Sequence, residues 1–329
     1  MSRLRRRGKP RLYGKLKAGR QVMLSNLLDN PKLFRHVVED LPVGIYIVDR
    51  DGLIRFWNHG AEHLMGHLSH DVVGHVFEDV VKACNRRGNS LSGEYCPVTM
   101  TLSQRQPQQW SAYYLHKNGH RLAVKIRTRP ILEYGDTVGG ATVLFDEAFG
   151  GREEPSEAPM YGCVDATTGI PSRRLTRALL NECIAGMEKS RVGFGLLRIR
   201  VLRLEEFRSK HGPQSAVPFL RTAAQTLRHS LDAENFLGCW GENEFLAVLT
   251  SASPVMVSTM AETLWNLLRH SEVTWWGDRF PIESEVSYTV ASVGANVESL
   301  LEEMKPSRSS GTAKAAVAGA VKNSVPAQG

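Results

Sequence analysis

Cysteine is scarce in this sequence, and long apolar runs are missing. Five cysteines stand among 329 residues, and no two of them form a Cys-x-x-Cys pair. This excludes a disulfide framework or a zinc ribbon as the organising feature, and we expect free thiols in a reducing compartment. No stretch approaches the roughly 20 apolar residues that cross a bilayer, and no apolar segment follows the basic N-terminus as in a secretory signal. We therefore expect a cytoplasmic protein without a transmembrane segment.

Net positive charge is missing outside the first 20 residues. The formal charge of +7 includes nine Lys and Arg in residues 1–20, where no acidic residue stands, so the rest of the chain carries about −2. The basic character thus belongs to a tail, which predicts a solvated, disordered extension. Contact of the tail with nucleic acid or with an anionic membrane surface is the alternative. Met23 is an alternative start to Met1, and a chain that began there would lack the basic tail.

Size and composition favour two globular domains joined by a linker. Apolar residues make up 42% of the chain and charged residues 23%, as in ordinary folded proteins. A segment rich in Gly, Pro and Glu without apolar periodicity separates the two parts. The predicted organisation is a basic tail at 1–30, a first domain at 31–147, a linker at 148–164, a second domain at 165–305 and a low-complexity tail at 306–329. Small residues predict disorder in that last tail, with a frayed helix as the alternative.

The first predicted domain alternates strand and helix patterns. β-rich runs on both sides of Arg50-Asp51-Gly52 predict two strands joined by a turn. Residues 59–83 have the apolar spacing of short helices broken by glycine. Two further strands meet at Asn118-Gly119, and residues 139–147 are typical of a last strand. We therefore expect an α+β domain in which helices cover one face of an antiparallel sheet.

These elements, in this order, resemble a PAS sensor domain. The runs "LPVGIYIVD", "DGLIRFWN" and "GAEHLMG" follow one another as in that family, and "LHKNGHRLAV" resembles its later hairpin. The resemblance covers about 110 residues and implies the PAS fold, a small ligand or protein partner, and homodimerisation. It leaves the PAS ligand unidentified. Asn58, directly after "RFW", is expected to cap the following helix.

Histidine is frequent in the first 120 residues, which raises the question of a cofactor site. Most of these histidines have polar or glycine neighbours, so surface positions are expected, with haem or flavin ligation as the alternative. Cys84 and Cys96, together with His116 and His120, offer a redox pair or metal ligands. However, "HKNGH" spans a hairpin turn and no spacing matches a zinc pattern, so ordinary structural roles are expected. The histidines are His36, His59, His63, His67, His70, His75, His116 and His120.

The second predicted domain alternates helices and strands, as in an α/β fold. "RLTRALLNECIAGMEKS" and "AVPFLRTAAQTLRHSL" are amphipathic, and "FGLLRIRVLRL" between them alternates like a strand. Two motifs resemble the GGDEF domain, the nucleotidyl-cyclase-like fold of diguanylate cyclases: "DATTGIPSRR" at 165–174 and "CWGENEF" at 239–245. We expect the residues matched in the opening motif to turn the chain into the first helix and cap it. They are Asp165, Gly169, Pro171 and Arg174.

The second motif stands where the family has a Gly-Gly-Asp/Glu-Glu-Phe hairpin. The resemblance implies a reaction in which two GTP molecules meet across a homodimer, with metal ions held by hard oxygen ligands. Gly241, Glu244 and Phe245 match the family. Glu242 replaces a glycine, where a side chain obstructs the nucleotide, and Asn243 replaces an acidic residue, so a charge is lost. Glu244 is the best surviving site candidate, with an exposed turn carboxylate as the alternative.

The strand before the hairpin departs further from the family. Residues 200–212 align without gaps with the family pattern, and Arg200 then stands where the metal-binding Asp belongs. Arg208 and Val217 occupy positions that contact the nucleotide in the family. A cation at a site for divalent ions costs several kcal/mol at an effective dielectric constant of about 20. The resemblance, carried over residue by residue, therefore implies that the metal position is lost.

These departures predict a signal-transduction protein. In it, a PAS sensor domain precedes a degenerate, catalytically silent GGDEF domain that serves in docking or regulation. No metal or cofactor is assigned on this interpretation, and a homodimer and an unidentified signalling partner are expected. One alternative is a divergent diguanylate cyclase that uses Glu242, Glu244 and a third ligand to convert two GTP to cyclic di-GMP with Mg²⁺. Another is a GTP-binding switch without turnover.

Overall fold

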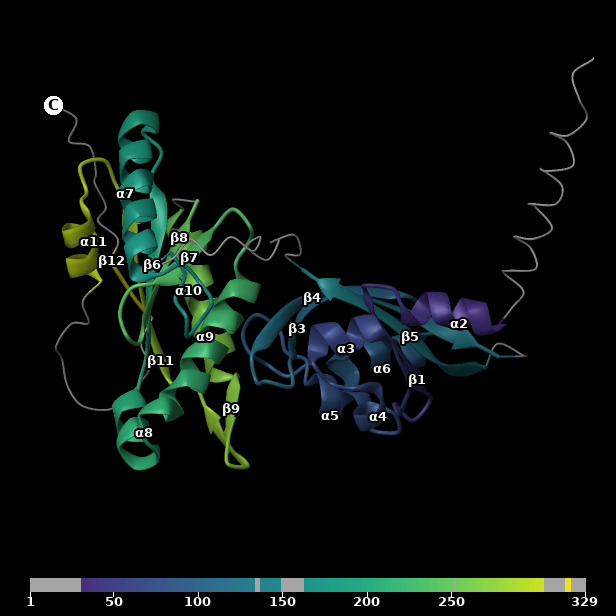
Figure 1. Ribbon diagram of the computed structural model, residues 1–329. Coiled ribbons are helices and arrows are strands. Elements are labelled where there is room, and N and C mark those ends of the chain that lie inside the picture. The colour runs from purple at the N-terminus through teal and green to yellow at the C-terminus, as the bar shows by residue number, and fades with distance from the viewer. Residues whose placement is uncertain (1–30, 134–136, 149–162, 251–252, 305–316, 321–329) are drawn as a thin grey trace, which may run out of the picture.

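The computed structural model describes residues 31–133, 137–148, 163–250, 253–304 and 317–320. These residues form two lobes that lie side by side (Figure 1). The expected tail at 1–30, residues 149–162 of the expected linker and most of the C-terminal tail lie outside the described residues. None of the helices in the described part of the chain is both long and apolar enough to span a membrane.

The N-terminal lobe is a five-stranded antiparallel sheet with helices on one face, as the sequence predicts. The strand order is β2-β1-β5-β4-β3, and helices α3 to α6 lie under the sheet in Figure 1. The strands are β1 (Gly44–Asp49), β2 (Ile54–Trp57), β3 (Gln108–Leu115), β4 (Arg121–Leu132) and β5 (Val138–Glu147). The helices are α2 (Pro31–Glu39), α3 (His59–Met65), α4 (Ser69–Val72), α5 (Phe77–Val81) and α6 (Pro97–Gln104).

Aromatic side chains fill the space between this sheet and its helices. Tyr46 of β1 stacks on Trp57 of β2, with ring centroids 5.5 Å apart. The hydroxyl of Tyr46 lies 3.3 Å from that of Tyr114 in β3, so the two buried hydroxyls satisfy each other. Phe77 and Phe145 complete the cluster. Burial of each ring contributes about 2 to 3 kcal/mol, which makes this cluster the centre of the lobe.

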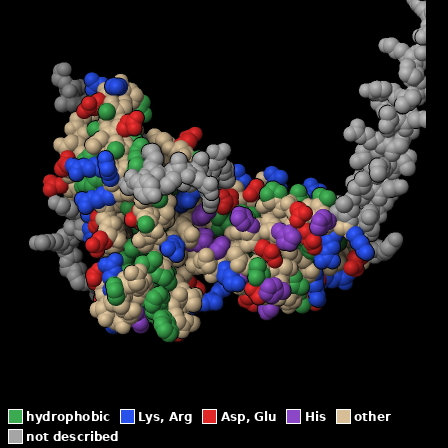
Figure 2. Space-filling view, viewed as in Figure 1, with side chains coloured by type: hydrophobic (Ala, Val, Ile, Leu, Met, Phe, Trp, Pro, Cys, Tyr) green, Lys and Arg blue, Asp and Glu red, His purple; other side chains and the backbone are tan. Residues whose placement is uncertain are grey.

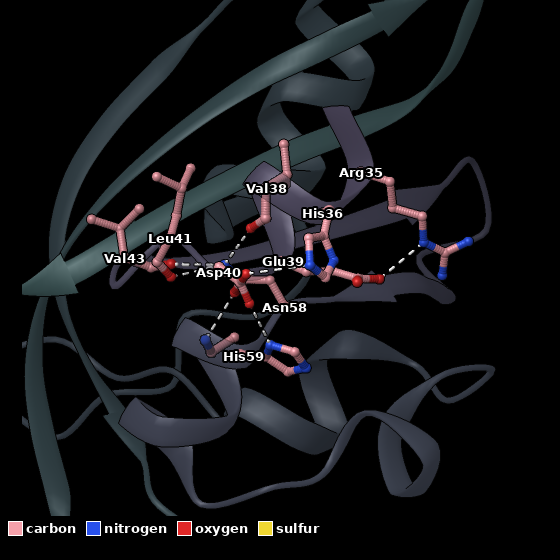
Figure 3. Close-up of polar contacts among 10 residues, drawn as sticks. Arg35, His36, Val38, Glu39, Asp40, Leu41, Val43, Asn58 and His59 are labelled. Carbon is pink, nitrogen blue, oxygen red and sulfur yellow. Dashed lines mark hydrogen bonds and ion pairs between the residues drawn. The ribbon is translucent and has the colours of Figure 1, made fainter. Parts of the chain in front are cut away.

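Asn58 begins α3 and also fastens the segment that precedes β1 (Figure 3). Its Oδ1 accepts hydrogen bonds from the backbone N–H groups of Ala61 at 2.8 Å and Ile45 at 2.7 Å. The predicted helix cap is therefore confirmed. Its Nδ2 donates to three backbone carbonyl oxygens, those of Val38, Leu41 and Val43. The side chain is buried, so water cannot replace these bonds if they are lost.

The C-terminal lobe is an α/β domain, again as predicted. Its sheet has the order β12-β11-β6-β8-β7, and β9 and β10 form a separate two-stranded ribbon. The strands are β6 (Phe194–Val201), β7 (Phe236–Cys239), β8 (Glu244–Leu249), β9 (Glu272–Trp275), β10 (Asp278–Pro281), β11 (Ser284–Ala291) and β12 (Val317–Ala320). The helices are α7 (Arg173–Ser190), α8 (Leu204–His211), α9 (Val217–Ser230), α10 (Pro254–Arg269) and α11 (Val297–Glu303).

Helices cover both faces of this second sheet. Successive side chains of a strand point to opposite faces, so Leu196 and Leu197 of β6 enter different cores. Leu197 packs in a cluster with Leu264 of α10. Leu196 packs in another cluster with Leu180 of α7 and Leu300 of α11. Arg200 near the end of β6 pairs with Glu244 at the start of β8, so the second motif lies at one end of these two inner strands.

Some elements differ from the sequence-based expectation. Helix α6 was not predicted, because β-branched residues such as Val98 and Thr101 are poor helix formers and only packing against the sheet selects the helix. Residues Val317–Ala320 form β12, which pairs in parallel with β11. For these four residues the expectation of disorder or a frayed helix was wrong. A distant strand supplies their partner, which the local sequence does not reveal.

Candidate functional site

The hairpin of β7 and β8 carries the second motif, and its turn is bonded to the neighbouring strand. The backbone N–H of Trp240 donates to the carbonyl of Glu244 at 2.8 Å and closes the turn. Asn243 accepts a hydrogen bond from the N–H of Val201 at 2.9 Å, and its Nδ2 donates to the carbonyl of Val201 at 2.8 Å. The side-chain amide of Asn243 is thus committed to the backbone of β6.

Glu244 lies between two arginines of β6. Nη2 of Arg198 donates to both carboxylate oxygens at 2.9 Å, and Nε of Arg200 donates to Oε1 at 2.8 Å. Arg200 is directly opposite Glu244 on one side and Glu285 of β11 on the other. The Nη1 atom of Arg200 is 3.6 Å from the Glu285 carboxylate. Charges of alternating sign therefore cross three neighbouring strands.

The carboxylate of Glu244 is mostly shielded from water. The side chain is 14% exposed, and that of Arg198 is 16% exposed. Burial alone would raise the pKa of Glu244, but the hydrogen bonds and charges of Arg198 and Arg200 outweigh burial and lower the pKa below its ordinary value. Glu244 is therefore ionised at neutral pH. Charge-assisted pairs of this kind are stronger than neutral hydrogen bonds.

The other residues that the sequence predicts as departures from the family are Glu242, Arg208 and Val217. Arg208 of α8 is 3.5 Å from the carboxylate of Glu242 and also bonds to Glu205. The side chain of Glu242 is 85% exposed, so its pairing with Arg208 contributes little to stability. Val217 is half-buried as the first residue of α9. The structure thus brings Arg200 to Glu244 and Arg208 to Glu242, as separate pairs.

The side chains at the position that the resemblance predicts for a metal ion do not fit a divalent cation. Mg²⁺ takes oxygen ligands in an octahedral shell, with carboxylates that remain available to it. Here Arg200 is itself a cation, and both oxygens of Glu244 already accept hydrogen bonds from guanidinium groups. No group of three or more acidic, His or Cys side chains suited to a metal ion occurs among the residues that the structure describes. A metal ion would have to displace two guanidinium groups.

The opening motif folds into a tight turn. Oδ1 of Asp165 accepts hydrogen bonds from the backbone N–H of Thr168 at 2.9 Å and from its hydroxyl at 2.7 Å. Gly169 has φ +72°, a conformation that glycine adopts readily. The carbonyl of Pro171 accepts from the N–H of Cys239 at 2.8 Å. The turn is therefore attached to β7, the first strand of the hairpin.

The predicted cap of the following helix was wrong. Ser172 is the N-cap residue of α7, and it makes no side-chain capping bond there. Arg174 lies exposed in the first turn of α7. Asp165, Gly169 and Pro171 bend the chain before the helix, but the backbone around Ser172 begins it.

A cavity of about 370 Å³ is lined by residues outside the hairpin. It is bounded by α8 and β10, with Phe207, Phe219 and Phe280 among its lining. At its rim Arg203 is 2.8 Å from Glu283. Arg200, Arg208, Asn243 and Glu244 are not among its lining residues. The motif hairpin is thus not set in this cavity.

Arg198 and Glu285 were missed by the sequence analysis. Alternation along β6 was recognised, so a signal for Arg198 existed: residues two apart on a strand share a face. Arg198 should have been placed beside Arg200 on that basis. Glu285 had no such signal, because its position opposite Arg200 depends on the register between β6 and β11.

Cys84, Cys96 and His120 of the N-terminal lobe are buried, so the surface position expected for His120 was wrong. Cys84 and Cys96 are buried free thiols, and burial raises the pKa of each. They are therefore protonated and weakly nucleophilic at neutral pH. The rings of His116 and His120 stack across the β3–β4 turn with centroids 4.2 Å apart.

Comparison with protein families finds two matches along the chain. Residues 32–147 match the family described as the PAS fold. Residues 163–307 match the family described as "Diguanylate cyclase, GGDEF domain". No curated protein sequence matches the chain.

Several solved structures are similar to parts of the chain. The diguanylate cyclase SiaD of Pseudomonas aeruginosa, solved with its activator SiaC, is 20% identical over 43% of this chain and 54% of its own, with a TM-score of 0.41. The GGDEF domain of DgcB from Caulobacter crescentus, solved with c-di-GMP, is 16% identical over 44% and 84%, with a TM-score of 0.42. A PAS domain from Colwellia psychrerythraea is 20% identical over 35% and 93%, with a TM-score of 0.31. The chain spans about half the length of SiaD.

Proposed function

Because this chain consists of a PAS domain followed by a GGDEF domain, we propose that it is a signal-transduction protein whose GGDEF domain acts in docking or regulation and does not turn over GTP. The PAS domain senses a ligand or a partner, and the GGDEF domain passes the signal to a downstream protein. A cytoplasmic location, a homodimer and an unidentified signalling partner belong to the same proposal.

The observation that carries the proposal is the pairing of Glu244 with Arg198 and Arg200. Catalysis in the family requires cations beside the phosphates, where they neutralise developing charge. The carboxylate best placed for this task is bonded to two guanidinium groups. Arg200 would also repel a divalent cation by several kcal/mol at an effective dielectric constant of about 20. The proposal therefore rests on the charge of the site rather than on the shape of the hairpin.

The direct test is incubation of the purified full-length protein with GTP and either Mg²⁺ or Mn²⁺, followed by chromatographic analysis for cyclic di-GMP. We expect no product above a blank without protein. Product that disappears in both Glu244→Gln and Glu244→Ala would establish the rival function, a divergent diguanylate cyclase. Product that persists in both variants would point to a contaminating enzyme.

A calorimetric titration with GTP separates the two remaining possibilities. If the titration gives no heat of binding for GTP, the result supports a docking module. Saturable binding without product would mean that the domain is a GTP-binding switch, and Arg208→Ala would then be expected to weaken it, since Arg208 replaces a nucleotide-contacting residue of the family. Light scattering on the same sample tests the homodimer.

A further inference from the structure

The turn of the β3–β4 hairpin lies against the C-terminal lobe. We call residues 115–121 the PAS hairpin tip. The carbonyl of Gly119 accepts a hydrogen bond from the backbone N–H of Glu272 at 3.0 Å, at the start of β9. The N–H of Arg121 donates to the hydroxyl of Thr226 in α9 at 3.1 Å. One turn of the PAS domain is therefore bonded to α9 and to the corner between α10 and β9.

Arg121 joins the two lobes through its side chain. Its Nε donates to the carbonyl of His270 at 3.0 Å, and its Nη1 donates to the carbonyl of Lys82 at 2.6 Å. His270 follows α10, whereas Lys82 follows α5 of the PAS domain. The residue is only 7% exposed. Separating the lobes would break the bond between this buried guanidinium and the carbonyl of His270. Both groups would then lack a partner, which costs free energy.

Gly119 fits its position so closely that no other residue is accommodated. A Cβ atom there would lie 1.6 Å from the carbonyl oxygen of Glu272, and φ is +86°. The backbones of the two lobes are therefore in direct contact. Gly88 shows the same close approach, since a Cβ atom would lie 2.3 Å from Nδ1 of His270.

Apolar and imidazole groups extend the contact around the tip. Leu267 of α10 packs in one cluster with Cys84, Tyr113 and Ala123 of the PAS domain. The ring of His120 stacks between His116 on one side and His229 of α9 on the other, with centroids 4.2 and 5.5 Å apart. Figure 2 shows histidine side chains gathered where the two lobes meet. A small cavity of about 110 Å³ remains beside the tip, lined by His116 and Gly119 on one side and Glu272 on the other.

The PAS hairpin tip connects two places of functional interest. On the PAS side it continues β3, in which Tyr114 bonds to Tyr46 in the aromatic core. On the other side Thr226 belongs to α9, the helix that begins at Val217, the altered nucleotide position. A displacement of β3 must therefore move α9 or break the contact, because helices and close-packed side chains do not deform continuously.

We propose that the PAS hairpin tip transmits the state of the PAS core to α9 and the α10–β9 corner of the GGDEF domain. The hydroxyl of Thr222 in α9 also donates to the carbonyl of Asn118 at 3.4 Å. The interaction surface on the C-terminal lobe is formed by Thr222, Thr226, Leu267, His270 and Glu272, and its partner is the PAS domain of the same chain. The proposal holds whether or not the GGDEF domain turns over GTP, so the cyclase assay does not decide it.

Hydrogen exchange of the full chain tests the contact first. Gly119→Ala inserts a methyl group between the lobes, and we expect amides of residues 222–230 and 266–272 to exchange about tenfold faster than in the parent. The matched control is Gly74→Ala, also at positive φ (+90°) but with nothing within 4 Å of the added Cβ. It should leave both segments unchanged.

Folding is checked in the same experiment through residues 44–48 of β1, whose amides should stay protected in both variants. If they do and Gly119→Ala leaves 222–230 and 266–272 at parental rates, the lobes do not dock through this tip and the proposal is overturned. If β1 also loses protection, Arg121→Met replaces Gly119→Ala and must give the expected acceleration for the proposal to stand.

A double-mutant cycle tests transmission itself. Tyr114→Phe removes the hydrogen bond to Tyr46 inside the PAS core, and we expect it to change exchange at 222–230 by about fivefold in the parent chain. In the Gly119→Ala background the same substitution should have little effect there. An equal effect in both backgrounds, or none in the parent, would show that the tip is only a structural contact.

Discussion

At the scale of one residue, Glu244 matches the hairpin motif of the family, but its carboxylate is bonded to two arginines. From the sequence, Glu244 is predicted to be the surviving acidic residue and Arg200 a cation at the metal position. The structure joins them, and it adds Arg198 as a second guanidinium on the same carboxylate. The side chain that a cyclase would offer to a metal ion is here one member of an ion-pair network across three strands.

Glu244→Gln should destabilise the C-terminal domain. Neutralising the carboxylate leaves Arg198 and Arg200 close together and half-buried without their shared counter-charge, which we expect to cost about 1 to 3 kcal/mol of unfolding free energy. Urea denaturation followed by tryptophan fluorescence measures this. A carboxylate that belonged to an empty metal site would respond in the opposite way, because its neutralisation relieves repulsion.

The control for this variant is Glu285→Gln. Glu285 contacts the same network through Arg200, at 3.6 Å. Neutralising Glu285 should therefore lower the unfolding free energy by less than neutralising Glu244 does. Equal costs for the two variants, or stabilisation by Glu244→Gln, would contradict the ion-pair role.

Asn58 carries a comparable structural role in the PAS domain. Asn58→Ala removes a helix cap and leaves buried carbonyl oxygens without a donor, so we expect a loss of about 2 to 4 kcal/mol in unfolding free energy. Thermal unfolding of the full chain measures this loss. The comparison is Asn296→Ala, which removes the exposed cap of α11 and should cost about 1 kcal/mol. Similar costs for both would mean that burial of Asn58 adds nothing.

At the scale of elements, local chemistry predicted those with local signals. Short helices broken by glycine were predicted for residues 59–83, and Gly66 ends α3 in the left-handed conformation. The turn at Asn118-Gly119 was predicted as well. Helix α6 and strand β9 were not predicted, because their conformation depends on packing against other elements and not on a local sequence pattern.

The PAS hairpin tip is an element whose stability should depend on pH. Burial, with smaller effects from neighbouring histidines, lowers the pKa of His116 to about 4 and that of His120 to about 2, against an ordinary value of 6.5. Both are neutral in the folded protein at pH 7. Below about pH 6.5 the unfolded chain binds protons that the folded protein does not, so stability falls as the pH drops towards 4.

Thermal unfolding between pH 7 and pH 4 measures this loss. We expect His120→Asn to reduce the slope of unfolding free energy against pH by at most about 1.4 kcal/mol per pH unit, the value for one proton. His75→Gln, at an exposed position, should leave the slope unchanged. A slope unaffected by His120→Asn would mean that the imidazole is not kept neutral by the fold.

At the scale of the whole molecule, the two domains are bonded to each other as well as linked in sequence. Arg121, Gly119 and the apolar cluster around Leu267 belong to the contact. The sequence predicts two domains and a linker but gives no sign of a contact between the domains. The structure therefore adds a direct contact between the domains, through which the proposed transmission would not depend on the linker.

Arg121→Met should separate the unfolding of the two domains. The substitution preserves the apolar stem but removes the donors to His270 and Lys82, so we expect a single calorimetric transition of the parent to split or broaden. Arg127→Met, at an exposed position on the same strand, is the control and should unfold like the parent. Two resolved transitions already present in the parent would show that the contact contributes little to cooperativity.

The sequence by itself determined the two fold families and most of their elements, and it predicts the loss of acidic residues at the family's metal position. Each of these depends on local pattern or on residue identity at a motif position, which alignment with a family preserves. Only the tertiary structure decided that two guanidinium groups hold Glu244 and that Gly119 meets Glu272. Those contacts join residues far apart in the chain, and strand register and domain packing alone set their distances.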